Sequence, residues 1–171
     1  METLNKKYNK TGLNIMEALN AGIDVCGALE ILEEAQSVHG CVDLAHITRD
    51  SGGFYELKEN LRGIIGVTQD YMPPECYRDP TETGGIDLYA LGMALYRLFN
   101  GNRAPFMPPW PQEIEDLSKD RNEAFQQRMN AAVLPLPQLA GFDIPELSEF
   151  TKIILKAGAF HKQDRWQNAT E

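Results

Sequence analysis

One stretch decides the fold of this 171-residue chain, and it reads Ile86-Asp87-Leu88-Tyr89-Ala90-Leu91-Gly92-Met93-Ala94-Leu95-Tyr96-Arg97-Leu98-Phe99. Its only charged residues are Asp87 and Arg97, and apolar side chains would occupy nearly every side of a helix formed here. A helix that is apolar all round is buried inside a protein. The stretch therefore predicts a central helix over residues 86–99, with other elements packed around it.

Three more helices are expected around that centre. Apolar residues recur at three- and four-residue steps from Asn14 to Glu34, which predicts a long amphipathic helix. A charged helix is expected over 112–130, with Pro111 at its entry. A further helix is expected over 145–159. These expectations describe a mainly α-helical protein.

Two short extended pieces at 47–48 and 54–57 flank Asp50-Ser51-Gly52-Gly53. An Asp and two Gly between apolar pieces are typical of a tight turn, so a small β-hairpin is predicted. The polar residues 1–12 are expected to form a flexible N-terminal segment. Residues 13–171 are then the folded domain.

A second informative stretch is Val38-His39-Gly40-Cys41-Val42-Asp43-Leu44-Ala45-His46-Ile47. It resembles the catalytic loop of protein kinases, H-R-D-x-x-x-x-N, in which the Asp orients the substrate hydroxyl and the Asn holds magnesium. Counted from His39, Cys41 stands at the Asp position and His46 at the Asn position.

The resemblance to kinases extends in the same order along the chain. Residues 66–75 resemble the segment G-T-x-x-Y-M-A-P-E with one insertion, and residues 87–96 resemble the D-x-Y-S-L-G motif of the central helix. Residues 164–166 match a late Arg motif, and residues 102–106 and 120–124 look like bacterial eukaryote-like Ser/Thr kinases. The resemblance implies a kinase-like C-terminal lobe, a helical bundle around a buried helix with a small hairpin, whose N-terminal lobe is absent.

Three residues are implied by this resemblance to support the fold. Asp87 would cap the backbone of the catalytic loop, and Glu75 would pair with Arg165. An Asp in the first turn of a helix also lies favourably at the positive end of the helix dipole.

The residues that would carry kinase chemistry are replaced. Cys41 has no carboxylate to accept a proton, Gly40 replaces an Arg, and Asp43 replaces the Lys that contacts the transferred phosphate. His46 offers an imidazole, which is a poor magnesium ligand. The D-F-G triplet falls on Glu59-Asn60-Leu61, where Glu59 keeps a carboxylate on a longer side chain. These are the degenerate positions of a pseudokinase.

His39, Cys41, Asp43 and His46 lie within eight positions of one another and include ligands that zinc accepts. A Cys41–His46 nucleophile pair for acyl chemistry is another interpretation. In the kinase loop, however, the His packs against the core and Cys41 would point elsewhere. The favoured interpretation is a packed His and an inert thiol, with no metal and no cofactor.

Composition narrows the classes of partner. Lys and Arg total 16 against 25 acidic residues, and the net charge of −9 is unfavourable for nucleic acids and anionic membranes. The sequence contains no apolar run of membrane-spanning length and no leader peptide, and the three cysteines occur in unrelated contexts. A cytoplasmic location is expected.

The sequence thus predicts a catalytically inactive kinase-like domain that acts as a protein-binding or scaffold module. Its partner is expected to be another protein or a second copy, bound through the face that an N-terminal lobe normally covers. The alternative is a Ser/Thr kinase fragment whose N-terminal lobe lies outside this chain or is supplied in trans.

Overall fold

The computed structural model describes residues 2–11, 14–60, 68–130, 133–138 and 145–171. The chain is mainly helical with a small three-stranded antiparallel sheet. The elements follow in the order β1 (Glu2–Thr3), α1 (Leu4–Thr11), α2 (Ile15–Glu34), β2 (Ile47–Arg49), β3 (Tyr55–Leu57), α3 (Pro74–Arg78), α4 (Ile86–Leu98), α5 (Leu117–Asn130), α6 (Pro145–Ala157) and a 3-10 turn (Lys162–Asp164). Among the helices of these ranges, none has the length and apolar character that a membrane crossing requires.

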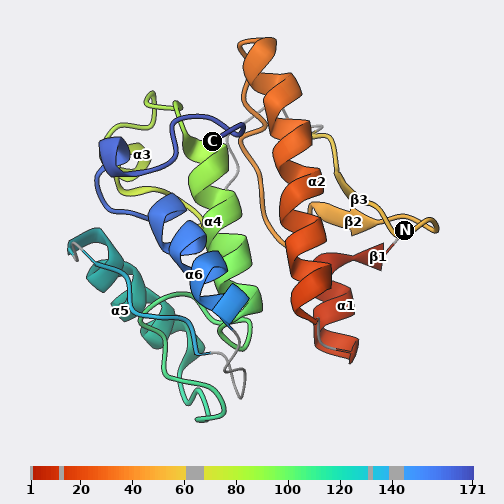
Figure 1. Ribbon diagram of the computed structural model, residues 1–171. Coiled ribbons are helices and arrows are strands. Elements are labelled where there is room, and N and C mark those ends of the chain that lie inside the picture. The colour runs from red at the N-terminus through yellow and green to blue at the C-terminus, as the bar shows by residue number, and fades with distance from the viewer. Residues whose placement is uncertain (1, 12–13, 61–67, 131–132, 139–144) are drawn as a thin grey trace.

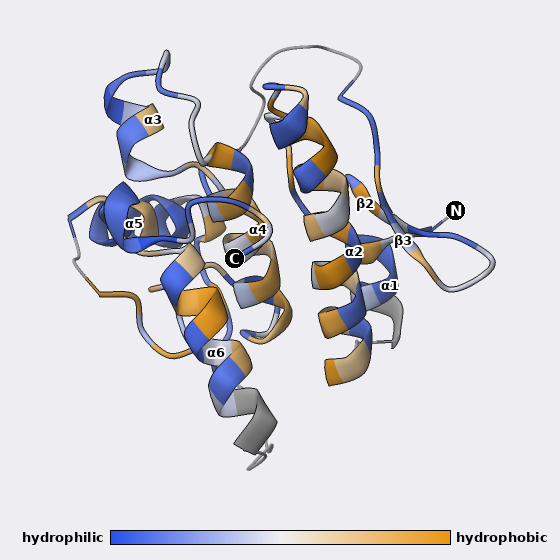
Figure 2. Cartoon of the chain, turned by 45° about the horizontal axis from the view of Figure 1, so that its top comes forward, coloured by the Kyte–Doolittle hydropathy of each residue, from blue (hydrophilic) through white to orange (hydrophobic). Residues whose placement is uncertain are grey.

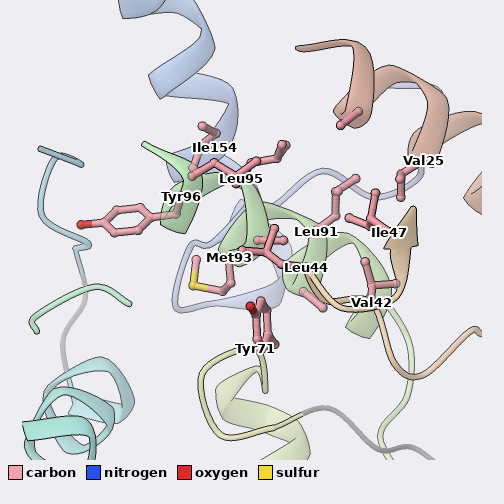
Figure 3. Close-up of a cluster of buried hydrophobic side chains, with 14 of the residues drawn as sticks. Val25, Val42, Leu44, Ile47, Tyr71, Leu91, Met93, Leu95, Tyr96 and Ile154 are labelled. Carbon is pink, nitrogen blue, oxygen red and sulfur yellow. The ribbon is translucent and has the colours of Figure 1, made fainter. Parts of the chain in front are cut away.

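Helix α4 is the centre of the fold. Every residue of α4 except Arg97 is buried, which confirms the predicted central helix. Figure 1 shows α4, in green, between α6 and α2, and it packs against both. The core drawn in Figure 3 joins the labelled residues Leu91, Met93, Leu95 and Tyr96 of α4 to Val25, Val42, Leu44, Ile47, Tyr71 and Ile154.

Helix α2 begins at a well-defined cap. The Asn14 side chain accepts a hydrogen bond from the Glu17 N–H at 2.9 Å, and the Glu17 carboxylate accepts one from the Asn14 N–H at 3.3 Å. This reciprocal capping box satisfies two backbone donors and fixes the start of the helix. The helix begins at Ile15, one residue after the predicted start. Ala18, Ala21 and Val25 form part of its buried face.

The predicted hairpin is present. Ile47 of β2 lies opposite Leu57 of β3, and Gly53 in the turn has φ 97°, a conformation that glycine adopts without strain. The Asp50 side chain accepts a hydrogen bond from the Phe54 N–H at 2.9 Å and closes the turn.

The N-terminal residues differ from expectation. Where a flexible segment is predicted over 1–12, β1 pairs antiparallel with β2, and α1 follows directly. The Leu4 side chain is only 1% exposed, and the Asn5 N–H donates to the Leu44 carbonyl at 2.8 Å. A buried leucine, the strand pairing and side-chain contacts such as the Lys7–Glu17 ion pair hold a segment whose composition is otherwise polar.

Helix α5 begins at Leu117, later than the predicted Gln112. The Asp116 side chain accepts a hydrogen bond from the Lys119 N–H at 3.0 Å, so Asp116 caps the helix. Before it, the Arg103 guanidinium donates to the carbonyls of Pro108 and Gln112, each at 2.6 Å, and holds that stretch as a loop. Helix α6 ends at Ala157, two residues earlier than predicted.

Candidate functional site

The loop of residues 38–47 connects α2 to β2 and is fastened to the first turn of α4. The Asp87 carboxylate accepts hydrogen bonds from the backbone N–H of His39 at 2.6 Å and of Gly40 at 2.8 Å. This is the contact that the kinase resemblance implies for Asp87. Burial raises the pKa of Asp87, while the two N–H donors act in the opposite direction because they favour the charged carboxylate.

His39 joins the loop to the segment after β3. Its buried ring places Nε2 2.6 Å from the Lys58 carbonyl, and the Cys41 N–H donates to Nδ1 at 3.2 Å. Because a carbonyl only accepts, Nε2 carries the proton in this arrangement. The Asn60 side chain also donates to the His39 carbonyl at 2.8 Å. Both ring nitrogens are therefore occupied by backbone contacts.

Cys41, Asp43 and His46 converge on one another. The Cys41 sulfur lies 3.6 Å from both ring nitrogens of His46, and His46 Nδ1 lies 2.8 Å from Asp43 Oδ1. One potential ligand atom from each residue lies within 4.8 Å of the other two. Cys41 and Asp43 are buried, whereas the His46 side chain is 33% exposed.

The sequence predicts that Cys41 points away from the packed His39 side chain, and in the structure the Cys41 thiol lies beside His46. The turn at Asp43 is the physical reason. Its Oδ1 accepts hydrogen bonds from the Ala45 N–H at 2.7 Å and the His46 N–H at 2.9 Å, which folds the loop back and brings His46 over Cys41. His39 takes no part in the cluster.

The Cys41–His46 pair is poorly arranged for acyl chemistry. A sulfur equally distant from both ring nitrogens is not in line with either nitrogen lone pair, so neither nitrogen is aligned to take the thiol proton.

The remaining predicted positions lie apart from this cluster. Glu59 is exposed and does not belong to it. Leu61 of the proposed D-F-G equivalent and residues 66–67 of the following motif lie outside the described residues.

Glu75 and Arg165 form the ion pair that the resemblance implies. Arg165 donates to the two Glu75 oxygens at 2.5 and 2.8 Å, and also to the Ala159 carbonyl at 2.6 Å. Its guanidinium carbon lies 4.6 Å from the centre of the Tyr89 ring. The bidentate pair ties α3 to the C-terminal segment and to the central helix.

Sequence reasoning missed a second polar cluster, centred on buried Asp70. Arg97 donates to its carboxylate at 2.9 Å and Arg121 at 2.7 Å, while Arg128 donates to its backbone carbonyl at 2.5 Å. Asp70, Arg97 and Arg121 line part of a cavity of about 150 Å³ beside α5. The available signal was Arg97 itself, because a cation on an apolar buried helix requires a partner.

No protein-family model matches the chain. Over 186 aligned residues it is 25% identical to the serine/threonine-protein kinase PknK of Mycobacterium bovis and to that of Mycobacterium tuberculosis. Each alignment covers 100% of this chain but 15% of the relative, so the chain spans a small part of these proteins. The similarity indicates a distant kinase-like relation.

Proposed function

We propose that this chain is a catalytically inactive, kinase-like lobe that acts as a protein-binding or scaffold module. The observation that carries the proposal is the contrast within one loop. Asp87 holds the loop through two backbone hydrogen bonds, yet the residue that the loop would present as a base is Cys41. The hydrogen bonds that fasten the loop to α4 are present, whereas the side chains that a kinase uses for phosphoryl transfer are replaced.

The environment of Asp43 also argues against phosphoryl transfer. A kinase places a lysine here to neutralise charge on the transferred phosphate, whereas a carboxylate repels it. The Asp43 carboxylate is moreover engaged by its own loop, through the N–H groups of Ala45 and His46. His46 supplies an imidazole where magnesium requires oxygen.

The proposed surface for a protein partner lies on α2. Met16, Ile23 and Ile31 are 62%, 67% and 69% exposed, and spacings of seven and eight residues place them along one side of the helix. Figure 2 shows apolar bands along the length of α2. Exposed apolar stripes of this kind mark interaction surfaces. We assign protein binding to this stripe.

The first test of inactivity is a thermal unfolding experiment with and without millimolar Mg·ATP. A ligand at one hundred times its dissociation constant adds about 2.7 kcal/mol, or roughly 2 to 4 °C for a chain of this size. We expect no change in Tm. A reproducible rise that disappears without magnesium would establish a nucleotide site and contradict this function.

The binding surface is tested separately by sedimentation velocity over a range of protein concentrations. We expect self-association, which the double variant Ile23→Asp/Ile31→Asp abolishes without loss of helicity. The control is Leu117→Asp, which places one such charge at a 54% exposed apolar position on α5 and should leave association unchanged. A wild-type chain that remains monomeric at the highest concentration would contradict self-association through this stripe.

A second candidate is a protein kinase of which this chain is one part. It is favoured by the similarity to the mycobacterial PknK proteins, which are serine/threonine-protein kinases. We expect that Cys41→Asp alone restores no phosphoryl transfer, because the lysine and the magnesium-binding groups stay replaced. A large recovery of activity would favour this candidate over the first.

A further inference from the structure

We propose that Cys41, Asp43 and His46 form a zinc site with three protein ligands and one open coordination position. This inference is independent of the function proposed above, because it rests on the geometry of the loop and not on its likeness to kinases. The three side chains bring together a sulfur, a carboxylate oxygen and an imidazole nitrogen within 4.8 Å.

The spacing of the ligand atoms agrees with tetrahedral zinc. Zn–S bonds of about 2.3 Å and Zn–N bonds of about 2.0–2.1 Å hold sulfur and nitrogen roughly 3.5 Å apart in a tetrahedral site. Cys41 Sγ lies 3.6 Å from either nitrogen of His46. The sulfur is already at the tetrahedral separation, and a rotation of the His46 ring that aims one nitrogen at the ion lets both side chains bind it.

Asp43 lies close enough to His46 to share the ion with it. Its Oδ1 is held by the N–H groups of Ala45 and His46 and lies 2.8 Å from His46 Nδ1. An ion that takes the place of the proton between Nδ1 and the carboxylate is bound by His46 Nδ1, the ring nitrogen nearest Asp43. Within the described part of the chain, no residue hydrogen-bonds Asp43 Oδ2, which is the oxygen available to the ion.

The combination of donors selects the metal. Thiolate, imidazole and carboxylate are the ligands found in zinc sites, whereas magnesium and calcium take oxygen donors. A site built on Cys41 and His46 therefore discriminates against the magnesium that a kinase loop binds.

The loop is held in shape before any ion binds. Asp87 fixes the backbone of His39 and Gly40, and His39 fixes the N–H of Cys41, so the ligands begin from an ordered frame. His46 is one-third exposed and provides the entry path. The fourth position is open to water or to a donor atom of a partner molecule, as in other zinc sites with three protein ligands.

The test is a titration of the full chain, freed of metal with a chelator, against Zn²⁺ in competition with a chromophoric indicator. We expect one zinc per chain. Replacing zinc with Co²⁺ should produce a thiolate-to-cobalt charge-transfer absorption, which reports a sulfur ligand directly in the wild-type protein.

Variants assign the ligands. Cys41→Ser should remove the charge-transfer band, and both Cys41→Ser and His46→Asn should weaken zinc binding by about 100-fold, the upper end of the loss seen when only an outer contact of a ligand is removed. Cys26→Ser and Cys76→Ser are the matched controls and should bind as the wild type does. Circular dichroism of each variant shows whether weaker zinc binding comes from the missing side chain or from unfolding of the protein.

Two results would overturn the site. The first is a wild-type chain that binds no zinc, or binds Co²⁺ without the charge-transfer band, a result that needs no variant. The second is zinc binding that survives in Cys41→Ser and His46→Asn but falls in Cys26→Ser or Cys76→Ser.

Discussion

At the residue scale, Asp87 is the side chain on which the loop depends. Replacing it with Ala leaves two buried backbone donors without an acceptor, and each such donor costs about 1–3 kcal/mol. We therefore expect Asp87→Ala to lower the free energy of unfolding by about 2–6 kcal/mol in urea denaturation. Asp87→Asn keeps one acceptor oxygen and should cost less.

The control for this prediction is Glu123→Ala. Glu123 occupies an exposed position on α5 and has a 3.9 Å ion pair with Lys119, so its loss should change stability by less than about 0.5 kcal/mol. Equal stabilities of Asp87→Ala and Glu123→Ala would show that the attachment of the loop to α4 adds nothing to the fold.

The sequence located the candidate loop but not its internal arrangement. Spacing along the chain grouped His39, Cys41, Asp43 and His46, of which the structure brings the last three together. Their convergence depends on how Asp43 Oδ1 gathers two backbone N–H groups, a geometry that no spacing rule contains. The Asp70 cluster was missed because its arginines are 27, 51 and 58 residues away in sequence.

At the element scale, the contact between α4 and α6 depends on Gly92. A Cβ added there would lie 2.6 Å from the Ala157 Cβ, closer than two carbon atoms pack. We expect Gly92→Ala to force the helices apart and to cost about 1–3 kcal/mol of unfolding free energy. Chemical denaturation followed by circular dichroism measures this.

Gly27 is the matched control for Gly92, because it is a glycine inside helix α2 with no atom within 4 Å of an added Cβ. Gly27→Ala should stabilise the protein by about 0.5–1 kcal/mol through helix propensity alone. If both substitutions change stability in the same direction, packing at Ala157 does not limit the approach of α4 and α6.

Elements whose signals are local were predictable, and elements held by distant contacts were not. Helix α4 and the hairpin follow from apolar pattern and turn residues within short stretches. Helix α1 and strand β1 depend on contacts of Leu4 and Asn5 with residues about forty positions away, such as Leu44. Composition does not reveal such distant contacts, and for this reason a flexible segment was predicted over residues 1–12.

At the scale of the whole molecule, the core makes the fold sensitive to alkali. Burial raises the pKa of five tyrosines, Tyr8, Tyr55, Tyr71, Tyr89 and Tyr96. The pKa of Tyr71 rises from 10.0 to about 12. A phenol that ionises less readily in the folded state contributes stability that is fully present below pH 10 and is lost as the pH rises through its folded pKa.

We therefore expect stability to fall steeply between about pH 10 and 12, with tyrosine ionisation and loss of helical circular dichroism in one cooperative transition. Two pKa units at Tyr71 correspond to about 2–3 kcal/mol. Tyr71→Phe should consequently lose less stability over this interval than the wild type does. Tyr77→Phe, at a 58% exposed position, is the control and should leave the transition where it is. Complete tyrosine ionisation while the helical signal persists would mean that the core admits solvent, and that the buried phenols do not couple to folding.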